Sequence, residues 1–325
     1  MRPPLSDILL GCALGDSWGR AVERKSLEVI QKEYGWEGVP LPEGDLLITD
    51  DTQMSLYLAE ALAADAAVWD IPREVCQAWV DWLDDPENFR APGLTCLDAA
   101  RKLKDGVPWQ DATDTSSDGS GAVMRTWACA YLPEHLQNGV AMWQAASTHG
   151  APNAVMASVI ATRLAADGFN EGEVTATISE LCRDVGWLTK DDKAWLVGLD
   201  GMGDTDTVGA FIERGRTGIL SKVDAAWKLV NDGSSDPWSF DPSDTFPGWR
   251  SHDALLCAAV CLDMFHGDPA SAVRRAVTTE GDSDTIGAVA GALAARRHPF
   301  PWKGIDANWY TRLEPGYLEW IGRFN

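Results

Sequence analysis

The sequence lacks the features that mark membrane, secreted and disulfide-stabilised proteins. None of its 325 residues belong to an uninterrupted apolar run of about 18 or more, the length typical of a membrane-spanning helix. The N-terminus has no charged region followed by an apolar run and a small-residue cleavage site, so we expect a cytoplasmic protein. The seven cysteines form no C-x-x-C pair, and because most lie among apolar positions we expect buried free thiols.

Positive charge is also scarce, since 27 Lys and Arg side chains stand against 49 Asp and Glu side chains, for a formal net charge of −22. This excess of negative charge opposes binding to nucleic acid and to anionic membranes. An anionic small ligand stays admissible, provided that backbone N–H groups, a helix N-terminus or a metal ion receives it locally.

Strand patterns are missing as well, because no alternating apolar and polar segment is longer than four residues. Apolar residues instead recur at the spacing of amphipathic helices, so we expect an all-α fold whose length suits one large domain or two. Helices are predicted at residues 5–14, 54–62, 72–83, 97–103, 123–132, 152–167, 173–185, 219–230, 252–265, 269–277 and 286–294. Residues 15–19 are predicted to end the first helix, although their small side chains permit close backbone approach. The Gly- and Pro-rich or polar segments 25–47, 106–121 and 231–249 are predicted as loops.

Two acidic turns each precede an apolar helical pattern. They are Thr49-Asp50-Asp51-Thr52 and Gly281-Asp282-Ser283-Asp284-Thr285. Taken alone, each turn is more typical of a capped helix than of a ligand set, because Asp and Thr side chains satisfy the free N–H groups of a helix start. If the two turns faced each other, four carboxylates would need a cation, and all-oxygen ligands select Mg²⁺, Mn²⁺ or Ca²⁺ over zinc. The sequence does not establish that they face each other.

Four further features have competing interpretations. The segment 118–125, with Gly119 and Gly121, is similar to an anion-binding loop, although a plain helix-start turn is commoner. His149, just before a predicted helix, either caps and packs or contacts a ligand. Glu23 by itself is typical of a solvated surface carboxylate. Residues 203–209 nearly copy the second acidic turn, but the apolar pattern behind them is poor, so we predict a loop there.

Taken together, five motifs in the same order resemble those of the ADP-ribosylglycohydrolase family, across nearly the whole chain. They are Gly15-Asp16-Ser17-Trp18-Gly19 with Glu23, Thr49-Asp50-Asp51-Thr52, Gly119-Ser120-Gly121-Ala122-Val123-Met124-Arg125, Thr148-His149, and Gly281-Asp282-Ser283-Asp284-Thr285. They match the family's GDxxGxxxE, TDDT, GNGxxMR, TH and GDTDT. Each motif alone is common, but five in order are highly specific. The chain departs from the pattern at Ser120, Ser283 and Glu280, where the family often has Asn, Thr and Gly.

The resemblance implies a compact orthogonal bundle of many helices, a single domain over residues 1–325, and two divalent cations, Mg²⁺ or Mn²⁺, in a central cleft. The implied metal ligands are Thr49, Asp50, Asp51, Asp282, Asp284 and Thr285. The implied substrate contacts are Gly119, Ser120, Gly121, Ala122, Met124 and His149. Glu23 or Asp282 is implied as the catalytic carboxylate.

The implied activity is hydrolysis of the bond between ADP-ribose and an ADP-ribosylated protein or small molecule, with ADP-ribose as the product. Water would attack the anomeric carbon of the ribose at the metal site. Arginine-linked substrates are the first expectation. The alternatives are serine-linked, other O-linked or small-molecule conjugates, and a non-catalytic protein that binds ADP-ribose or a partner on the same fold.

Overall fold

The computed structural model describes residues 2–63, 67–233 and 236–325, and their fold is all-α. Within these ranges β pairing is confined to isolated bridges, such as the one between Leu46 and Leu313. No helix in the described part of the chain is long and apolar enough to cross a membrane. The all-α prediction is therefore confirmed.

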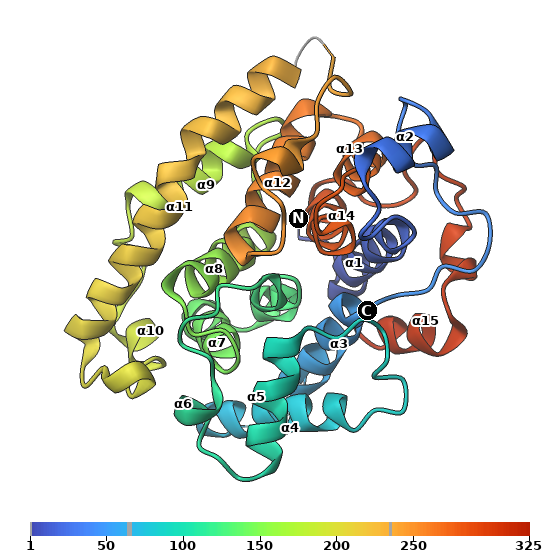
Figure 1. Ribbon diagram of the computed structural model, residues 1–325. Coiled ribbons are helices and arrows are strands. Elements are labelled where there is room, and N and C mark those ends of the chain that lie inside the picture. Colours follow the sequence, from blue (N-terminus) through green and yellow to red (C-terminus); the bar gives the residue numbers. More distant parts are fainter. Residues whose placement is uncertain (1, 64–66, 234–235) are drawn as a thin grey trace.

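The α-helices are joined by loops and short 3₁₀ helices (Figure 1). The α-helices are α1 (Leu5–Arg20), α2 (Leu27–Tyr34), α3 (Asp50–Ala63), α4 (Ile71–Leu83), α5 (Leu94–Lys104), α6 (Trp109–Ala112), α7 (Glu134–Ala146), α8 (Pro152–Asp167), α9 (Val174–Arg183), α10 (Lys190–Ala194), α11 (Thr205–Gly233), α12 (Ser251–Met264), α13 (Pro269–Val277), α14 (Ser283–Arg297) and α15 (Pro315–Gly322). The predicted helices at 72–83, 152–167, 252–265 and 269–277 agree with α4, α8, α12 and α13 to within one residue at each end.

The centre of the molecule is the pair α1 and α14, which run side by side (Figure 1). Every residue of α14 from Ser283 to Ala295 is buried, which is typical of a helix surrounded by others. The two helices approach through glycines, since a β-carbon on Gly15 would lie 1.8 Å from the carbonyl oxygen of Gly287. The helix α1 therefore continues through residues 15–19, and the prediction that they end it is wrong.

The long helix α11 lies along one edge of the molecule, against α8 and α9 (Figure 1). Residues 203–209 lead into this helix, so the loop prediction there is wrong. The sequence misleads because glycines inside α11 look like helix breakers, whereas they permit close packing. A β-carbon on Gly215 would lie 2.4 Å from the carbonyl oxygen of Pro152 in α8. Asp204 caps α11 by accepting a hydrogen bond from the backbone N–H of Thr207 at 2.9 Å.

Other segments also differ from their predictions. The segment 25–47 contains the short helix α2, which Ser26 caps. The segment 231–249 starts inside α11, and residues 126–131 form a 3₁₀ helix where an α-helix was expected. The helix α7 lies in a stretch with no predicted element. All seven cysteines are unpaired, and all are buried except the half-buried Cys76, which agrees with the predicted free thiols.

Candidate functional site

The two acidic turns meet at one cavity of about 270 Å³. Asp50 and Asp51, at the start of α3, line it together with Asp282, Asp284 and Thr285 around the start of α14. The Thr285 hydroxyl donates a hydrogen bond to Asp51 Oδ2 at 3.4 Å, which links the two turns directly. The fold therefore brings together five of the six side chains that the family resemblance assigned to metal binding.

Asp16 of α1 holds the first turn in place. Its carboxylate accepts hydrogen bonds from the backbone N–H of Thr49 at 3.0 Å, and from the backbone N–H and the hydroxyl of Thr52 at 3.1 and 2.5 Å. The start of α3 is thus capped by a side chain of another helix. Asp51 Oδ1 remains buried without a hydrogen-bond partner among the described residues, so it is an orphaned oxygen that a cation would satisfy. No local sequence signal identifies Asp16 as the cap.

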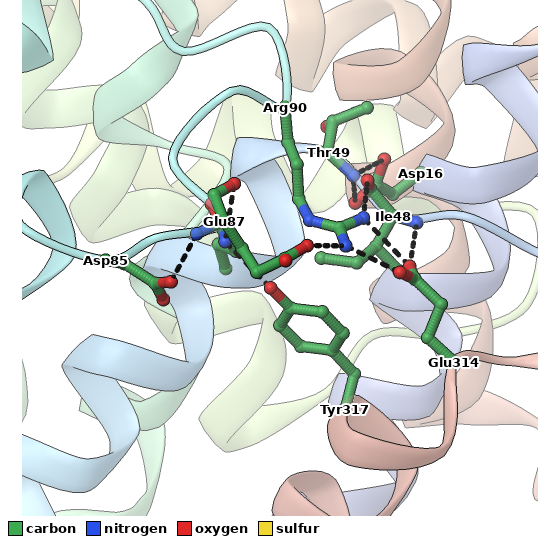
Figure 2. Close-up of polar contacts among 9 residues, drawn as sticks. Asp16, Ile48, Thr49, Asp85, Glu87, Arg90, Glu314 and Tyr317 are labelled. Atoms are coloured by element: carbon green, nitrogen blue, oxygen red, sulfur yellow. Dashed lines mark hydrogen bonds and ion pairs between the residues drawn. The ribbon is translucent and has the colours of Figure 1, made fainter.

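The segment before α3 is held from another side by Arg90 and Glu314 (Figure 2). Arg90 donates to both carboxylate oxygens of Glu314, at 2.9 and 2.5 Å, and to the carbonyl oxygen of Ile48 at 3.1 Å. The Arg90 carbonyl accepts the backbone N–H of Asp50 at 3.0 Å, and Glu87 accepts another guanidinium hydrogen bond at 2.6 Å. The sequence gives no hint of this pair, because Arg90 and Glu314 lie 224 positions apart.

The second turn is tied to α1 and to the glycine loop, which is the segment of residues 118–125 with Gly119 and Gly121. The Ser283 hydroxyl donates to the carbonyl oxygen of Gly19 at 2.9 Å. The Ser120 hydroxyl donates to Asp282 Oδ2 at 2.9 Å, and the Asp282 N–H donates to the carbonyl oxygen of Pro247 at 2.8 Å. Both serines that depart from the family pattern therefore use their hydroxyl groups to position this turn.

The clustered carboxylates resist being ionised together. Burial raises the pKa of Asp50, Asp51 and Asp282 well above the usual range for aspartate, and the neighbouring charge of Asp284 raises it further. Burial and the same neighbour raise the pKa of Asp16 to about 7. A bound divalent cation would oppose this effect, because it stabilises the charged form of the carboxylates around it.

The donor set fits a hard divalent cation in its chemistry. All six assigned ligands offer oxygen, and oxygen donors select Mg²⁺, Mn²⁺ or Ca²⁺. As the side chains stand, no three His, Cys, Asp or Glu residues in the described ranges have the geometry to hold one ion. Hydroxyl, backbone or water oxygens would therefore have to complete the shell of each ion. Thr49 lines a neighbouring cavity instead, and its hydroxyl donates to Asp51 Oδ2 at 3.2 Å.

The glycine loop forms another wall of the 270 Å³ cavity. The assigned substrate contacts that line it are Gly119, Ser120, Gly121, Met124 and His149. Ala122 does not line it and is fully buried. The Ser120 N–H donates to the carbonyl oxygen of Trp249 at 3.0 Å, so this N–H is not free to receive an anion. Trp249 also lines the cavity, although no sequence motif singled it out.

Glu23 stands between this cavity and a larger one of about 780 Å³, because it lines both. Its side chain is 15% exposed and forms an ion pair with Arg24 at 3.0 Å. Burial raises the pKa of Glu23, and the charge of Asp284 adds to this while Arg24 opposes it. A carboxylate with a raised pKa beside a cavity is a candidate for proton transfer. The larger cavity is also lined by Arg20, Glu87, Phe89, Arg90 and Glu314.

Comparison with known proteins agrees with the motifs. The family model described as ADP-ribosylglycohydrolase matches residues 6–324. A solved structure, an ADP-ribosylglycohydrolase-related protein complex, is 22% identical, with a TM-score of 0.59 over 98% of this chain and 97% of that chain. This likeness confirms the predicted type of helical bundle.

Curated proteins also match this chain, over differing shares of its length and of their own. The ADP-ribosylarginine hydrolase Tri1 of Pseudomonas putida is 26% identical over 327 residues, which cover 94% of this chain and 72% of Tri1. The uncharacterized protein YegU of Escherichia coli is 24% identical over 311 residues, covering 89% of this chain and 86% of YegU. An uncharacterized protein of Archaeoglobus fulgidus is 34% identical over 130 residues, which cover only 38% of this chain and 41% of that protein.

Proposed function

We propose that this chain, which belongs to the ADP-ribosylglycohydrolase family, is a metal-dependent hydrolase that releases ADP-ribose from an ADP-ribosylated acceptor. The observation that carries the proposal is the meeting of the two acidic turns at one cavity, with Glu23 at its edge and the glycine loop as another wall. A cluster of buried carboxylates with an orphaned oxygen is costly without a cation. Its presence therefore supports metal binding over a purely structural role.

The residues that would hold two divalent cations, Mg²⁺ or Mn²⁺, are Thr49, Asp50, Asp51, Asp282, Asp284 and Thr285. Ions bound there would lower the pKa of a water molecule and would bind the ribose hydroxyls. The chain's own contribution is position: Asp16 and the Arg90–Glu314 pair hold the first turn, while Ser120 orients Asp282. This support comes from three different parts of the fold, which favours a fixed arrangement of the two turns.

The reaction resembles glycoside hydrolysis. The water oxygen forms a bond to the anomeric carbon while the bond from that carbon to the acceptor breaks. A carboxylate takes a proton from the water and then passes it to the departing acceptor nitrogen or oxygen, which regenerates the carboxylate. Glu23 is the first candidate for this carboxylate, because its pKa is raised toward neutral pH and a carboxylate with a higher pKa takes up a proton more readily. Asp282 is the second, and its Oδ2 is already engaged by Ser120.

Arginine-linked conjugates are the first substrate class. The relative Tri1 is named an ADP-ribosylarginine hydrolase. Serine-linked, other O-linked and small-molecule conjugates form the alternative class, and a non-catalytic ADP-ribose-binding protein is the alternative of another kind.

A panel of ADP-ribosylated arginine, serine and small-molecule conjugates tests the proposal. Each is incubated with the protein in Mg²⁺, in Mn²⁺ and in EDTA, and free ADP-ribose is measured. Release from the arginine conjugate that depends on metal is the expected result. If the metal-loaded protein cleaves no conjugate yet binds ADP-ribose, the binding-protein alternative replaces the proposal.

A further inference from the structure

One ring nitrogen of His149, at the candidate site, is left without a hydrogen-bond partner in the described part of the chain. The side chain is 3% exposed and lines the candidate site. Its Nε2 makes no hydrogen bond within the described residues, whereas its Nδ1 is engaged. The Nε2 edge lies against the glycine loop: a β-carbon on Gly119 would be 3.0 Å from Nε2, and one on Gly121 would be 2.8 Å from Cε1. The loop's lack of side chains therefore leaves this edge of the ring open to the cavity.

The other ring nitrogen is part of a buried chain of hydrogen bonds. Thr148 Oγ1 lies 2.8 Å from His149 Nδ1. Arg125 Nη2 donates to the same Thr148 oxygen at 2.6 Å. Arg125 has no acceptor atom, so Thr148 Oγ1 must accept from it and keeps its own proton to give elsewhere.

The Thr148 proton has two acceptors within reach. One is the carbonyl oxygen of Ala145 at 3.4 Å. That oxygen already accepts the backbone N–H of His149 at 2.8 Å and of Thr148 at 3.2 Å, so it has little capacity left. The other is His149 Nδ1 at 2.8 Å, which is the shorter contact. The hydroxyl proton therefore goes to Nδ1, which must be unprotonated to accept it, and the ring proton sits on Nε2.

We propose that Arg125 and Thr148 are positioning residues that hold His149 as a neutral Nε2–H donor, aimed at an acceptor oxygen of the bound ligand. If the ligand is ADP-ribose, an identity that rests on the function proposed above, the acceptor oxygen belongs to the diphosphate or the ribose. The ligand class is thus one that presents an oxygen acceptor to a fixed uncharged donor. A protonated imidazolium is not needed for recognition.

The position of Arg125 is set from several sides. Its Nε donates to Gln144 Oε1 and its Nη2 to the Gln144 carbonyl, both at 3.0 Å. Its guanidinium also lies 4.1 Å from the ring centre of Trp79. The group is fully buried, so bulk solvent does not compete for its hydrogen bonds. The relay of hydrogen bonds from Arg125 through Thr148 to His149 therefore starts from a fixed side chain.

Burial, together with the charge of Arg125, keeps His149 neutral. Burial lowers the pKa of His149 to about 3, and the charge of Arg125 lowers it further while Asp114 opposes. Cys96, which lies against Gly121, stays a thiol because burial raises its pKa to about 11. The remaining charged groups of the cavity wall are Glu23, Arg24, Asp50, Asp51, Asp282 and Asp284. The donor therefore does not titrate in the physiological range.

The tautomer is measured directly by ¹⁵N–¹H correlation spectra of the full-length protein labelled at histidine. The His149 signals are those missing in His149→Gln. Protonated Nε2 and unprotonated Nδ1 between about pH 5 and 8 are expected. A protonated Nδ1, or both nitrogens protonated in this range, overturns the proposal whatever the protein's activity is.

Variants of Thr148 test the relay. Thr148→Val keeps the shape but removes the hydroxyl, so a mixture of tautomers and about 10-fold weaker ADP-ribose binding are expected. Thr148→Ser restores the hydroxyl and should recover both. Thr126→Val is the matched control, because it removes another fully buried threonine hydroxyl that bonds to Thr162 and not to His149.

The outcomes separate the two proposals. Wild-type affinity and an unchanged tautomer in Thr148→Val refute the relay, as does an equal loss of affinity in Thr126→Val, which would reflect general loosening of the core. If the wild-type protein binds no ADP-ribose at all, the proposed function fails, and the tautomer spectra still decide the relay.

Discussion

Gly15 and Gly287 let the two central helices pack closely, since a β-carbon on Gly15 would lie 1.8 Å from the Gly287 carbonyl oxygen. This contact lets α1 bring Asp16 to the first acidic turn while α14 presents the second. The geometry of the candidate site thus depends on two residues that have no side chain.

Gly15→Ala should destabilise the fold by about 1–3 kcal/mol, because the added methyl group meets backbone that cannot move aside. Urea unfolding measures the change. Gly209→Ala is the matched control: its β-carbon would meet nothing within 4 Å in α11, so helix propensity should raise stability by about 0.5–1 kcal/mol. The two Gly→Ala substitutions should therefore change the free energy of unfolding in opposite directions. No change in Gly15→Ala would contradict the close helix contact.

Asp284→Asn should weaken Mn²⁺ binding by more than about 10-fold, since it removes the charge of an assigned ligand from the cluster. Replacing a residue that only hydrogen-bonds to a metal ligand already lowers metal affinity by about 10-fold or more. Isothermal titration measures affinity and stoichiometry. Asp206→Asn, in the exposed turn that copies this sequence, is the control and should bind Mn²⁺ like the wild type. An equal loss in both variants would mean that the wrong turn was assigned to the metals.

Gly121→Val should weaken ADP-ribose binding while the bound metal content stays unchanged. The β-carbon alone would come within 2.8 Å of Cys96 Sγ and His149 Cε1, so the imidazole would be pushed from its place. Calorimetry with ADP-ribose and metal analysis of the same sample give the two readouts. Gly44→Val, in an exposed stretch where a β-carbon meets nothing within 4 Å, serves as the control. Unaltered ADP-ribose affinity in Gly121→Val would place the ligand elsewhere.

Glu23→Gln should lower turnover by roughly 10²-fold or more if Glu23 is the general base, because the amide keeps the shape but cannot take a proton. Such a loss corresponds to about 2.7 kcal/mol of barrier. Metal content and ADP-ribose affinity should persist, which distinguishes lost chemistry from a disrupted site. Glu33→Gln, an exposed carboxylate paired with Lys25, is the control. Full turnover in Glu23→Gln would transfer the role to Asp282.

The predictions from local pattern succeed and fail for identifiable reasons. The helices α4, α8, α12 and α13 follow from apolar periodicity, and α4, α8 and α13 also from a proline at the start, which are properties of neighbouring residues. Residues 15–19 and 203–209 mislead because glycine in a sequence looks like a helix breaker. In the fold, glycines of both helices instead permit close contact with a neighbouring helix, and that contact depends on residues far along the chain.

The sequence by itself determined the helical class, the free thiols and, through the order of five motifs, the family. Only the tertiary structure decided that Asp51 meets Thr285 across 234 positions, that Asp16, Arg90 and Glu314 hold the first turn, and that the copy around Asp204 stays exposed as a helix cap. The physical reason is range. Periodicity and capping act over a few residues, whereas the meeting of two turns depends on how buried helices pack, and that is a sum over contacts between distant parts of the chain.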